Sequence, residues 1–287
     1  FLEYASVIFL IIRLNGLYNI LLVFLWRNNR LFVFICFGDF IVIKADLSGK
    51  KALVTGASSG IGKAVATLLA QCGATVAVNH LIEDKRGPEV VDMLNGQGCQ
   101  SIAAPGNVAD PESADEMVAG ALERLGGLDI LINNAGTAAT VEPIPFDDLD
   151  SMTEERWQSI MHTNVIGPFR CSRAAVSALK VTKGCIVNTA SIAGIGNAGS
   201  SIAYANSKAA IISQTRCLAR ALAPDIRVNA VAPGSTRTAW TDPWNQDNKK
   251  MSIEASLLKR MVEPEDIAQG MLFLAVNPAM TGQIIVL

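Results

Sequence analysis

Three side chains that can give, take or hold a proton lie between residues 191 and 208. Ser191 supplies a hydroxyl, Tyr204 a phenol and Lys208 an ammonium group. If the segment from Ser201 onward is helical, Tyr204 and Lys208 project from the same face, one turn apart. A nearby ammonium favours phenolate, so the pair predicts a pKa for Tyr204 below the ordinary value of ~10. The chemistry this indicates is proton transfer to or from a carbonyl oxygen.

The same pair also has an ordinary structural interpretation. A tyrosine and a lysine four residues apart are often only neighbours on a helix surface, where the lysine stem covers apolar area. Ser191 favours the chemical interpretation because it ends an apolar run, residues 184–191, that is typical of a buried strand. Ligands bind at the carboxyl ends of strands in open α/β sheets. We therefore expect Ser191 to lie on the ligand side of a sheet.

A glycine-rich turn supplies the second part of the candidate site. It follows the apolar run Ala52–Thr55 and leads into a helical pattern that ends at Gly73. Glycines let the backbone approach a pyrophosphate, and the amino terminus of a helix supplies free N–H groups. Strand, turn and helix together predict that residues 56–62 bind a dinucleotide.

The residue after the second predicted strand, Ala74–Val78, decides which dinucleotide is expected. An acid there binds the ribose 2′-hydroxyl of NAD and repels the 2′-phosphate of NADP. This chain has Asn79 at the position. Basic side chains follow it, at His80, Lys85 and Arg86. NADP is therefore favoured over NAD, although the acids Glu83 and Asp84 lie in the same loop.

Strand-like and helical patterns alternate through residues 44–287, and no repeat or low-complexity linker divides them. This predicts one α/β domain with a doubly wound parallel sheet. Residues 151–179 are predicted as one long helical segment. Residues 235–261 lack periodicity and are predicted to form a loop over the substrate. Two further loops at strand ends are expected to line the cofactor: Asn107 with Val108, a candidate adenine contact, and Asn133–Gly136.

Composition excludes several other classes of protein. The 24 basic and 26 acidic residues are nearly balanced, which argues against a nucleic-acid partner. The six cysteines are scattered singly, so a disulfide framework or zinc site is not expected and a reducing compartment, the cytoplasm, is favoured. With only two histidines, we expect no metal site.

Residues 1–43 differ in composition from the rest of the chain and hold seven of its ten phenylalanines. One interpretation is a membrane anchor from about Tyr4 to Trp26, because a span needs ~20 mostly apolar residues. A signal peptide fits less well, since no basic start precedes the apolar run. The third is a mis-translated extension. We favour the extension, because the polar residues Arg13, Asn15 and Asn19 interrupt the span.

These motifs together resemble the short-chain dehydrogenase/reductase family from about Asp46 to the end. The resemblance is carried by Thr55–Gly62, Asn133–Gly136, Asn164, Ser191, Tyr204, Lys208, and Pro233–Gly234 followed by Thr238. It implies a Rossmann fold with seven parallel strands and a homo-oligomer, a tetramer or a dimer. It also implies hydride transfer between a nicotinamide cofactor and a small ketone or secondary alcohol.

The resemblance implies a role for each matched residue. Tyr204 would give a proton to the carbonyl oxygen or take it from the alcohol, and Ser191 would hydrogen-bond that oxygen. Lys208 would hold the nicotinamide ribose, and Asn164 would hold the water that links Lys208 to solvent. Positions expected to contact the cofactor are Gly56, Ser58, Gly60, Ile61, Gly62, Asn79, Asn107, Val108, Asn133, Gly136, Tyr204, Lys208, Gly234, Thr236 and Thr238.

Within the family the chain is similar to the branch around 3-oxoacyl-(acyl carrier protein) reductase. It stops at Leu287 without the family's usual Asp-Gly-Gly tail, which predicts a truncated C-terminus. Two other functions stay open. One is a non-catalytic dinucleotide-binding scaffold. The other is a membrane-anchored reductase of a lipid ketone, which requires residues 1–43 to be native.

Overall fold

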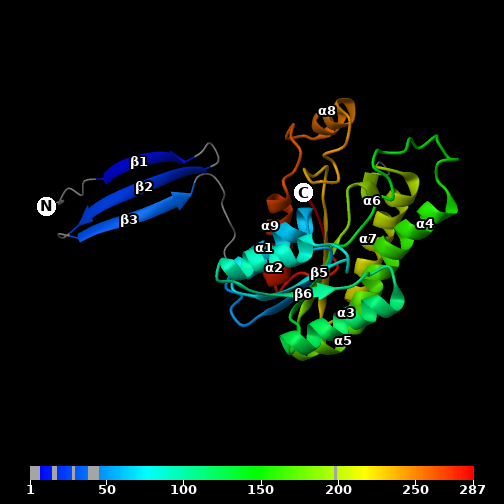
Figure 1. Cartoon of the computed structure of the whole chain (residues 1–287), viewed down its shortest axis with the longest axis horizontal. Helices are drawn as coiled ribbons and strands as arrows, with labels where there is room; N and C mark the ends of the chain where they lie inside the picture. The colour runs from blue at the N-terminus through cyan, green and yellow to red at the C-terminus, as the bar shows by residue number, and fades with distance from the viewer. Residues whose placement is uncertain (1–6, 15–17, 28–29, 38–44, 197–198) are drawn as a thin grey trace. The chain divides into compact units, whose positions relative to one another are not determined.

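The computed structural model describes residues 7–14, 18–27, 30–37, 45–196 and 199–287. The chain forms two compact units, residues 1–43 and residues 44–287 (Figure 1). All the residues predicted from the sequence to do chemistry belong to the second unit.

The first unit is an antiparallel sheet of strands β1 (Val7–Leu14), β2 (Tyr18–Arg27) and β3 (Arg30–Phe37), in that order. The described parts of the segment considered as an anchor are thus strands, while residues 1–6 and 15–17 lie outside the described residues. No helix in the part of the chain that the structure describes has the length and apolar character to cross a membrane. That residues 1–43 are a mis-translated extension stays a prediction.

The second unit is built on a parallel sheet, in which seven strands are described with the order β10-β9-β8-β7-β4-β5-β6. The strands are β4 (Lys51–Val54), β5 (Thr75–His80), β6 (Gln100–Pro105), β7 (Ile130–Asn133), β8 (Cys185–Thr189), β9 (Arg227–Ala232) and β10 (Ile284–Val286). The predicted doubly wound α/β fold in one domain is confirmed. The chain order reverses between β4 and β7, which is where a ligand crevice is expected in such sheets.

Helices cover both faces of this sheet (Figure 1). They are α1 (Gly60–Gln71), α2 (Arg86–Gly96), α3 (Pro111–Leu125), α4 (Glu154–Met161), α5 (Gly167–Thr182), α6 (Ala193–Gly196), α7 (Ile202–Leu222), α8 (Gln246–Ala255) and α9 (Pro264–Val276). Successive strand side chains point to opposite faces. Ala52 and Val54 therefore pack with α1 and α9, whereas Leu53 between them packs with α3 and α5.

Two elements differ from the predictions. The long helical segment 151–179 is interrupted between α4 and α5 by one π-helical turn, η1 (His162–Ile166). The predicted loop 235–261 contains α8, whose amino terminus is capped by the Asn245 side chain, which accepts a hydrogen bond from the Asn248 N–H at 2.8 Å. Every residue of α8 is described and none is buried. Its apolar residues are Met251, Ile253 and Ala255, whose spacing of two does not predict a helix.

Candidate active site

The structure brings Ser191, Tyr204 and Lys208 together at the carboxyl end of β8. Ser191 follows this strand, and Tyr204 and Lys208 lie on successive turns of α7, as predicted. The helix starts there because Ser201 caps it: its hydroxyl accepts a hydrogen bond from the Tyr204 N–H at 3.1 Å. The Lys208 Nζ lies 5.5 Å from the centre of the Tyr204 ring and donates to the Thr189 carbonyl at 2.8 Å.

The proton affinities of this site differ from the expectation that the ammonium lowers the pKa of the phenol. Burial raises the pKa of Tyr204 to about 12, although a hydrogen bond from Ser191 to the phenol oxygen acts in the opposite direction. Burial also lowers the pKa of Lys208 from 10.5 to about 8. Removal from water disfavours both charged forms. Tyr204 is therefore a phenol at neutral pH, the form that can donate a proton.

The lowered pKa of Lys208 predicts how Lys208→Met should change the pH dependence of stability. Between pH values near 8 and 10.5 the unfolded chain keeps a proton that the folded chain has lost, so wild-type stability gains as the pH rises. Methionine does not titrate, and the other groups are common to both proteins. The free energy of unfolding of the wild type should therefore rise relative to the variant by about 2 kcal/mol between about pH 7 and about pH 9.5.

Urea unfolding of both proteins at several pH values measures this difference. A difference that stays constant or shrinks with rising pH would show that burial does not depress the pKa of Lys208.

Asn164 lies buried in the π-helical turn and joins two parts of the site. Its Oδ1 accepts a hydrogen bond from the Thr137 N–H at 2.8 Å, and its Nδ2 donates to the Thr137 carbonyl at 2.9 Å and the Ser207 hydroxyl at 3.1 Å. Turns of this type are frequent at functional sites. Gly136 lies beside both Asn164 and Lys208, because a Cβ built on it would lie 3.4 Å from the Asn164 Oδ1 and 3.8 Å from the Lys208 Nζ.

The predicted phosphate loop precedes α1 and has the backbone that glycine requires. Gly56 and Gly60 have φ angles of 62° and 52°. A Cβ on Gly62 would overlap the Gly56 carbonyl oxygen and lie 2.5 Å from the Asn134 Nδ2. Ser59 makes no side-chain cap, and the first turn of α1, which is fully described, carries no acidic side chain. Its N–H groups and positive helix end therefore fit a pyrophosphate.

The two asparagines at the end of β7, Asn133 and Asn134, have different positions. Asn133 lies on the same face as Leu131, and its Nδ2 donates to the Ser172 hydroxyl at 3.0 Å and the Asn188 Oδ1 at 2.9 Å. The Nδ2 of Asn134 instead donates to the carbonyls of Thr55 and Gly56, at 3.1 and 3.2 Å, and so holds the glycine loop. The period of two along a strand separates the two side chains and is the signal that could have singled out Asn134.

The structure places the Asn79 side chain beneath the glycine loop. The strand β5 runs to His80 instead of ending at Val78. The Oδ1 of Asn79 accepts from the Gly56 N–H at 3.0 Å, and its Nδ2 donates to the carbonyls of Ala104 and Gly106, both at 3.0 Å. Because its amide group is engaged within the protein, Asn79 does not present it to a ribose, and the side chains that could distinguish NADP from NAD are those of the loop after β5.

An ion pair in this loop touches the glycine turn. The Ser58 hydroxyl donates to the Asp84 Oδ2 at 2.8 Å. The Arg86 guanidinium donates to both oxygens of the same carboxylate, each at 2.8 Å. These bonds hold the pKa of Asp84 far below its usual range. Arg86 is half exposed, so its charge lies beside Ser58 at the surface.

The remaining predicted cofactor positions lie at strand ends and in the chain after β9. Val108 is buried against Gly167, and Asn107 makes a turn in which its Oδ1 accepts from the Ala109 N–H at 2.9 Å. Beyond β9, the N–H of Gly234 donates to the Leu287 carbonyl at 2.7 Å. The Thr236 hydroxyl donates to the Gly234 carbonyl at 3.0 Å.

Residues 236–241 approach both the glycine loop and the Tyr204 ring. A Cβ on Gly60 would meet the Thr238 methyl at 3.2 Å. The Trp240 ring packs edge-on against Tyr204, with 5.7 Å between ring centres and an angle of 77° between their planes. Trp240 was not among the predicted site residues; an aromatic residue in a long aperiodic loop is the only signal the sequence offered.

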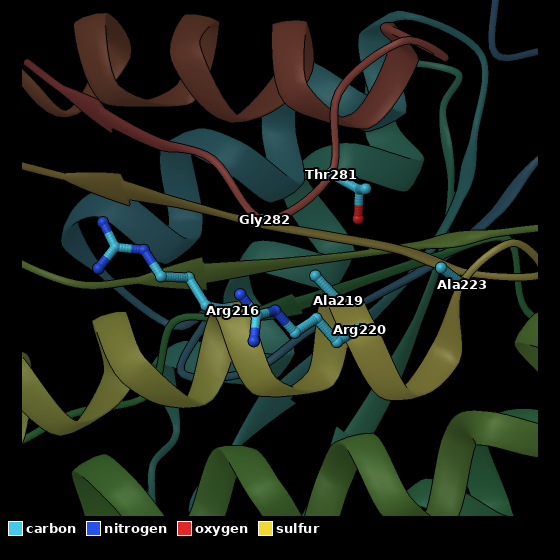
Figure 2. Close-up of a pocket in the computed structure, with 6 residues that line it drawn as sticks. All are labelled: Arg216, Ala219, Arg220, Ala223, Thr281 and Gly282. Atoms are coloured by element: carbon cyan, nitrogen blue, oxygen red, sulfur yellow. The ribbon is translucent and has the colours of Figure 1, made fainter.

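A separate cavity of about 380 Å³ lies along the second half of α7 (Figure 2). Arg216, Ala219, Arg220 and Ala223 line it from the helix and its end, and Thr281 and Gly282 line it from the turn before β10. It begins about two helical turns beyond Lys208. It is therefore distinct from the Ser191 site. Within the described residues, no cluster of three or more His, Cys, Asp or Glu side chains could hold a metal ion.

Proteins of similar sequence belong to a family of dinucleotide-dependent reductases. The family described as enoyl-(acyl carrier protein) reductase matches residues 56–287. A 3-oxoacyl-[acyl-carrier-protein] reductase of Staphylococcus epidermidis is 38% identical over 242 residues, which cover 82% of this chain and 96% of that protein.

Two solved structures have the same fold and similar sequences. A short-chain dehydrogenase of Burkholderia cenocepacia, in complex with NADP, is 33% identical with a TM-score of 0.76 and covers 85% of this chain and 98% of its own. A short-chain type dehydrogenase/reductase of Mycobacterium marinum is 37% identical with a TM-score of 0.77 and covers 84% of this chain and 95% of its own. The chain belongs to the short-chain dehydrogenase/reductase family of NAD(P)-dependent oxidoreductases, in the branch of the 3-oxoacyl-(acyl carrier protein) reductases.

Proposed function

We propose that this protein reduces the ketone of a 3-oxoacyl thioester to the alcohol with NADPH, with Tyr204 as the proton donor. The observation that carries the proposal is the convergence of Ser191, Tyr204 and Lys208 at the end of β8. The acyl class is supported by the relative named 3-oxoacyl-[acyl-carrier-protein] reductase. Small ketones and secondary alcohols outside this class remain alternatives.

Each residue of the proposed site has a defined task. The bound cofactor supplies a hydride to the carbonyl carbon. Ser191 donates a hydrogen bond to the ketone oxygen and stabilises the negative charge that develops there. Tyr204 then gives its proton to that oxygen, which completes the alcohol. The Lys208 ammonium lies close enough to stabilise the phenolate left behind, and Asn164 holds Thr137 and Ser207 in place beside it.

The preference for NADP is proposed on the charge of the loop after β5. Arg86 and Lys85 can meet a 2′-phosphate beside the glycine turn. Asp84 acts against this preference, but Arg86 already neutralises it. The Burkholderia cenocepacia relative, whose structure was solved with NADP, supports the same cofactor.

Activity with both cofactors tests the proposal. The full chain is assayed with acetoacetyl-coenzyme A, an ethyl 3-oxo ester and a simple ketone, each with NADPH and with NADH. We expect the highest kcat/KM for the thioester, and about tenfold or more with NADPH over NADH. Arg86→Ala should lower kcat/KM with NADPH by about tenfold and leave NADH within about twofold.

Arg173→Ala is the matched control, because Arg173 also pairs with an aspartate at the surface, Asp115, at 2.9 Å. Arg173→Ala should leave kcat/KM unchanged with both NADPH and NADH. Equal use of NADPH and NADH by the wild type would contradict the NADP assignment, and no turnover with any substrate would favour the scaffold hypothesis.

The remaining parts of the proposal concern location and assembly. Five of the six cysteines are free thiols, which supports a reducing compartment such as the cytoplasm: Cys72, Cys99, Cys171, Cys185 and Cys217. Assembly as a tetramer or dimer stays a prediction.

The membrane-anchored alternative depends on residues 1–43, and sequencing the amino terminus of the native protein tests it. A start near Lys44 would contradict an anchor.

A further inference from the structure

Glu142 makes a link between two segments that are more than a hundred residues apart in the sequence. Its Oε1 accepts a hydrogen bond from the Asn245 N–H at 3.0 Å, and its Oε2 accepts from the Asn248 Nδ2 at 3.0 Å. Both donors belong to the amino-terminal cap and first turn of α8. A carboxylate at this end of a helix is stabilised by the helix dipole.

The segment that carries Glu142 is itself tied to the catalytic helix. The Thr140 hydroxyl donates to the Glu142 carbonyl at 2.5 Å. Two residues further on, the N–H of the buried Ile144 donates to the Ser200 carbonyl at 2.7 Å. Ser201, the next residue, caps α7 at Tyr204. Hydrogen bonds therefore connect the start of α8 to the helix that holds Tyr204.

The segment 238–256, here called the lid, has little else to hold its outer part. Its base is fixed, because the Arg237 N–H donates to the Val262 carbonyl at 2.8 Å and the Arg237 side chain pairs with Glu263. The outer part consists of α8, whose described residues include no buried side chain. A helix without core packing is not held by apolar burial. The two hydrogen bonds to Glu142 therefore contribute a larger share of what holds α8 in place than they would on a helix packed against the core.

The lid places an aromatic side chain where a ketone would react. Trp240 packs against the Tyr204 ring at 5.7 Å and is 37% exposed. A partly exposed aromatic side chain beside a reactive group fits an acyl chain better than a charged substrate.

From these contacts we propose that Glu142 is a positioning residue that fixes the lid against α7, so that Trp240 stays on Tyr204 and the lid binds an acyl chain. Among the residues that the structure describes, the Glu142 carboxylate bonds Asn245 and Asn248 and neither Tyr204 nor Lys208, so it acts on substrate binding and not on proton transfer. The choice of an acyl chain rests on the function proposed above; the positioning of the lid does not.

Hydrogen exchange and steady-state kinetics on the full chain test this role. In Glu142→Ala the amides of residues 249–255 should exchange about tenfold faster than in the wild type, because local opening of α8 is no longer opposed. The KM for acetoacetyl-coenzyme A with NADPH should rise by about tenfold, with kcat within about twofold. Glu142→Gln should lie between, since its oxygen still accepts from Asn245 while its NH₂ group cannot accept from Asn248.

Glu123→Ala, which removes an exposed carboxylate from α3, is the control and should change neither quantity. Unchanged exchange in α8 of both Glu142 variants would overturn the proposal, as would a fall in kcat with KM unaltered. A wild-type protein that oxidises no NADPH with acetoacetyl-coenzyme A overturns the proposed function instead. The exchange result then decides alone: faster exchange supports the positioning of the lid by Glu142, and unchanged exchange overturns it.

Discussion

Tyr204→Phe should lower kcat for ketone reduction by roughly 10²–10⁴-fold while the affinity for NADPH changes by less than about threefold. The ring of a phenylalanine keeps the edge-on contact with Trp240 but removes the only proton that the phenol can give. Ser191 can still polarise the ketone oxygen, so a small residual rate is expected. The loss should appear in kcat and in kcat/KM alike, because the bond to the oxygen strengthens only as charge develops there.

Steady-state rates and a fluorescence titration with NADPH measure the two effects separately. Tyr18→Phe is the matched control, because it removes a phenol from the first unit and leaves residues 44–287 unchanged. Turnover within about tenfold of the wild type in Tyr204→Phe would contradict the role of the phenol as proton donor.

Gly62→Ala should abolish tight NADPH binding and destabilise the fold by about 1–3 kcal/mol. The added methyl would overlap the Gly56 carbonyl oxygen and press on the Asn134 amide, which holds the phosphate loop by its bond to the Gly56 carbonyl. Relief requires α1 to move away from β4 or the loop to open. Either movement displaces the N–H groups that fit the pyrophosphate.

Gly120→Ala is the control for this variant, since Gly120 is also within a helix and a Cβ there meets nothing within 4 Å among the described residues. It should stabilise the protein by about 0.5–1 kcal/mol through its higher helix propensity. Urea unfolding and NADPH titration of both variants give the comparison. Normal NADPH affinity in Gly62→Ala would contradict the placement of the cofactor on this loop.

The parts of the site that could be predicted are those fixed by short stretches of chain. Tyr204 and Lys208 share a helix face because four residues make about one turn, and Ser191 lies at a ligand edge because it ends a buried strand. The glycine loop could be predicted for a local reason too, since it joins the end of β4 at Val54 directly to the helix α1, which begins at Gly60. The alternation of strands and helices similarly predicted the doubly wound sheet.

The parts that could not be predicted depend on contacts between distant segments. The Asn79 amide bonds Gly56, Ala104 and Gly106, so its position is decided by two distant segments, the glycine loop and the end of β6. The raised pKa of Tyr204 depends on burial, which spacing along a helix does not reveal. The link from Glu142 to α8 spans more than a hundred residues and leaves no pattern in either segment.

The most direct test of the central claim is the stoichiometry of acetoacetyl-coenzyme A reduction by the wild-type full chain with NADPH. The proposed chemistry predicts one 3-hydroxy thioester formed for each NADPH oxidised, at a rate that Tyr204→Phe lowers by at least about a hundredfold. NADPH oxidation without the alcohol, or an equal rate in the variant, would contradict the assignment of Ser191, Tyr204 and Lys208 as the site of ketone reduction.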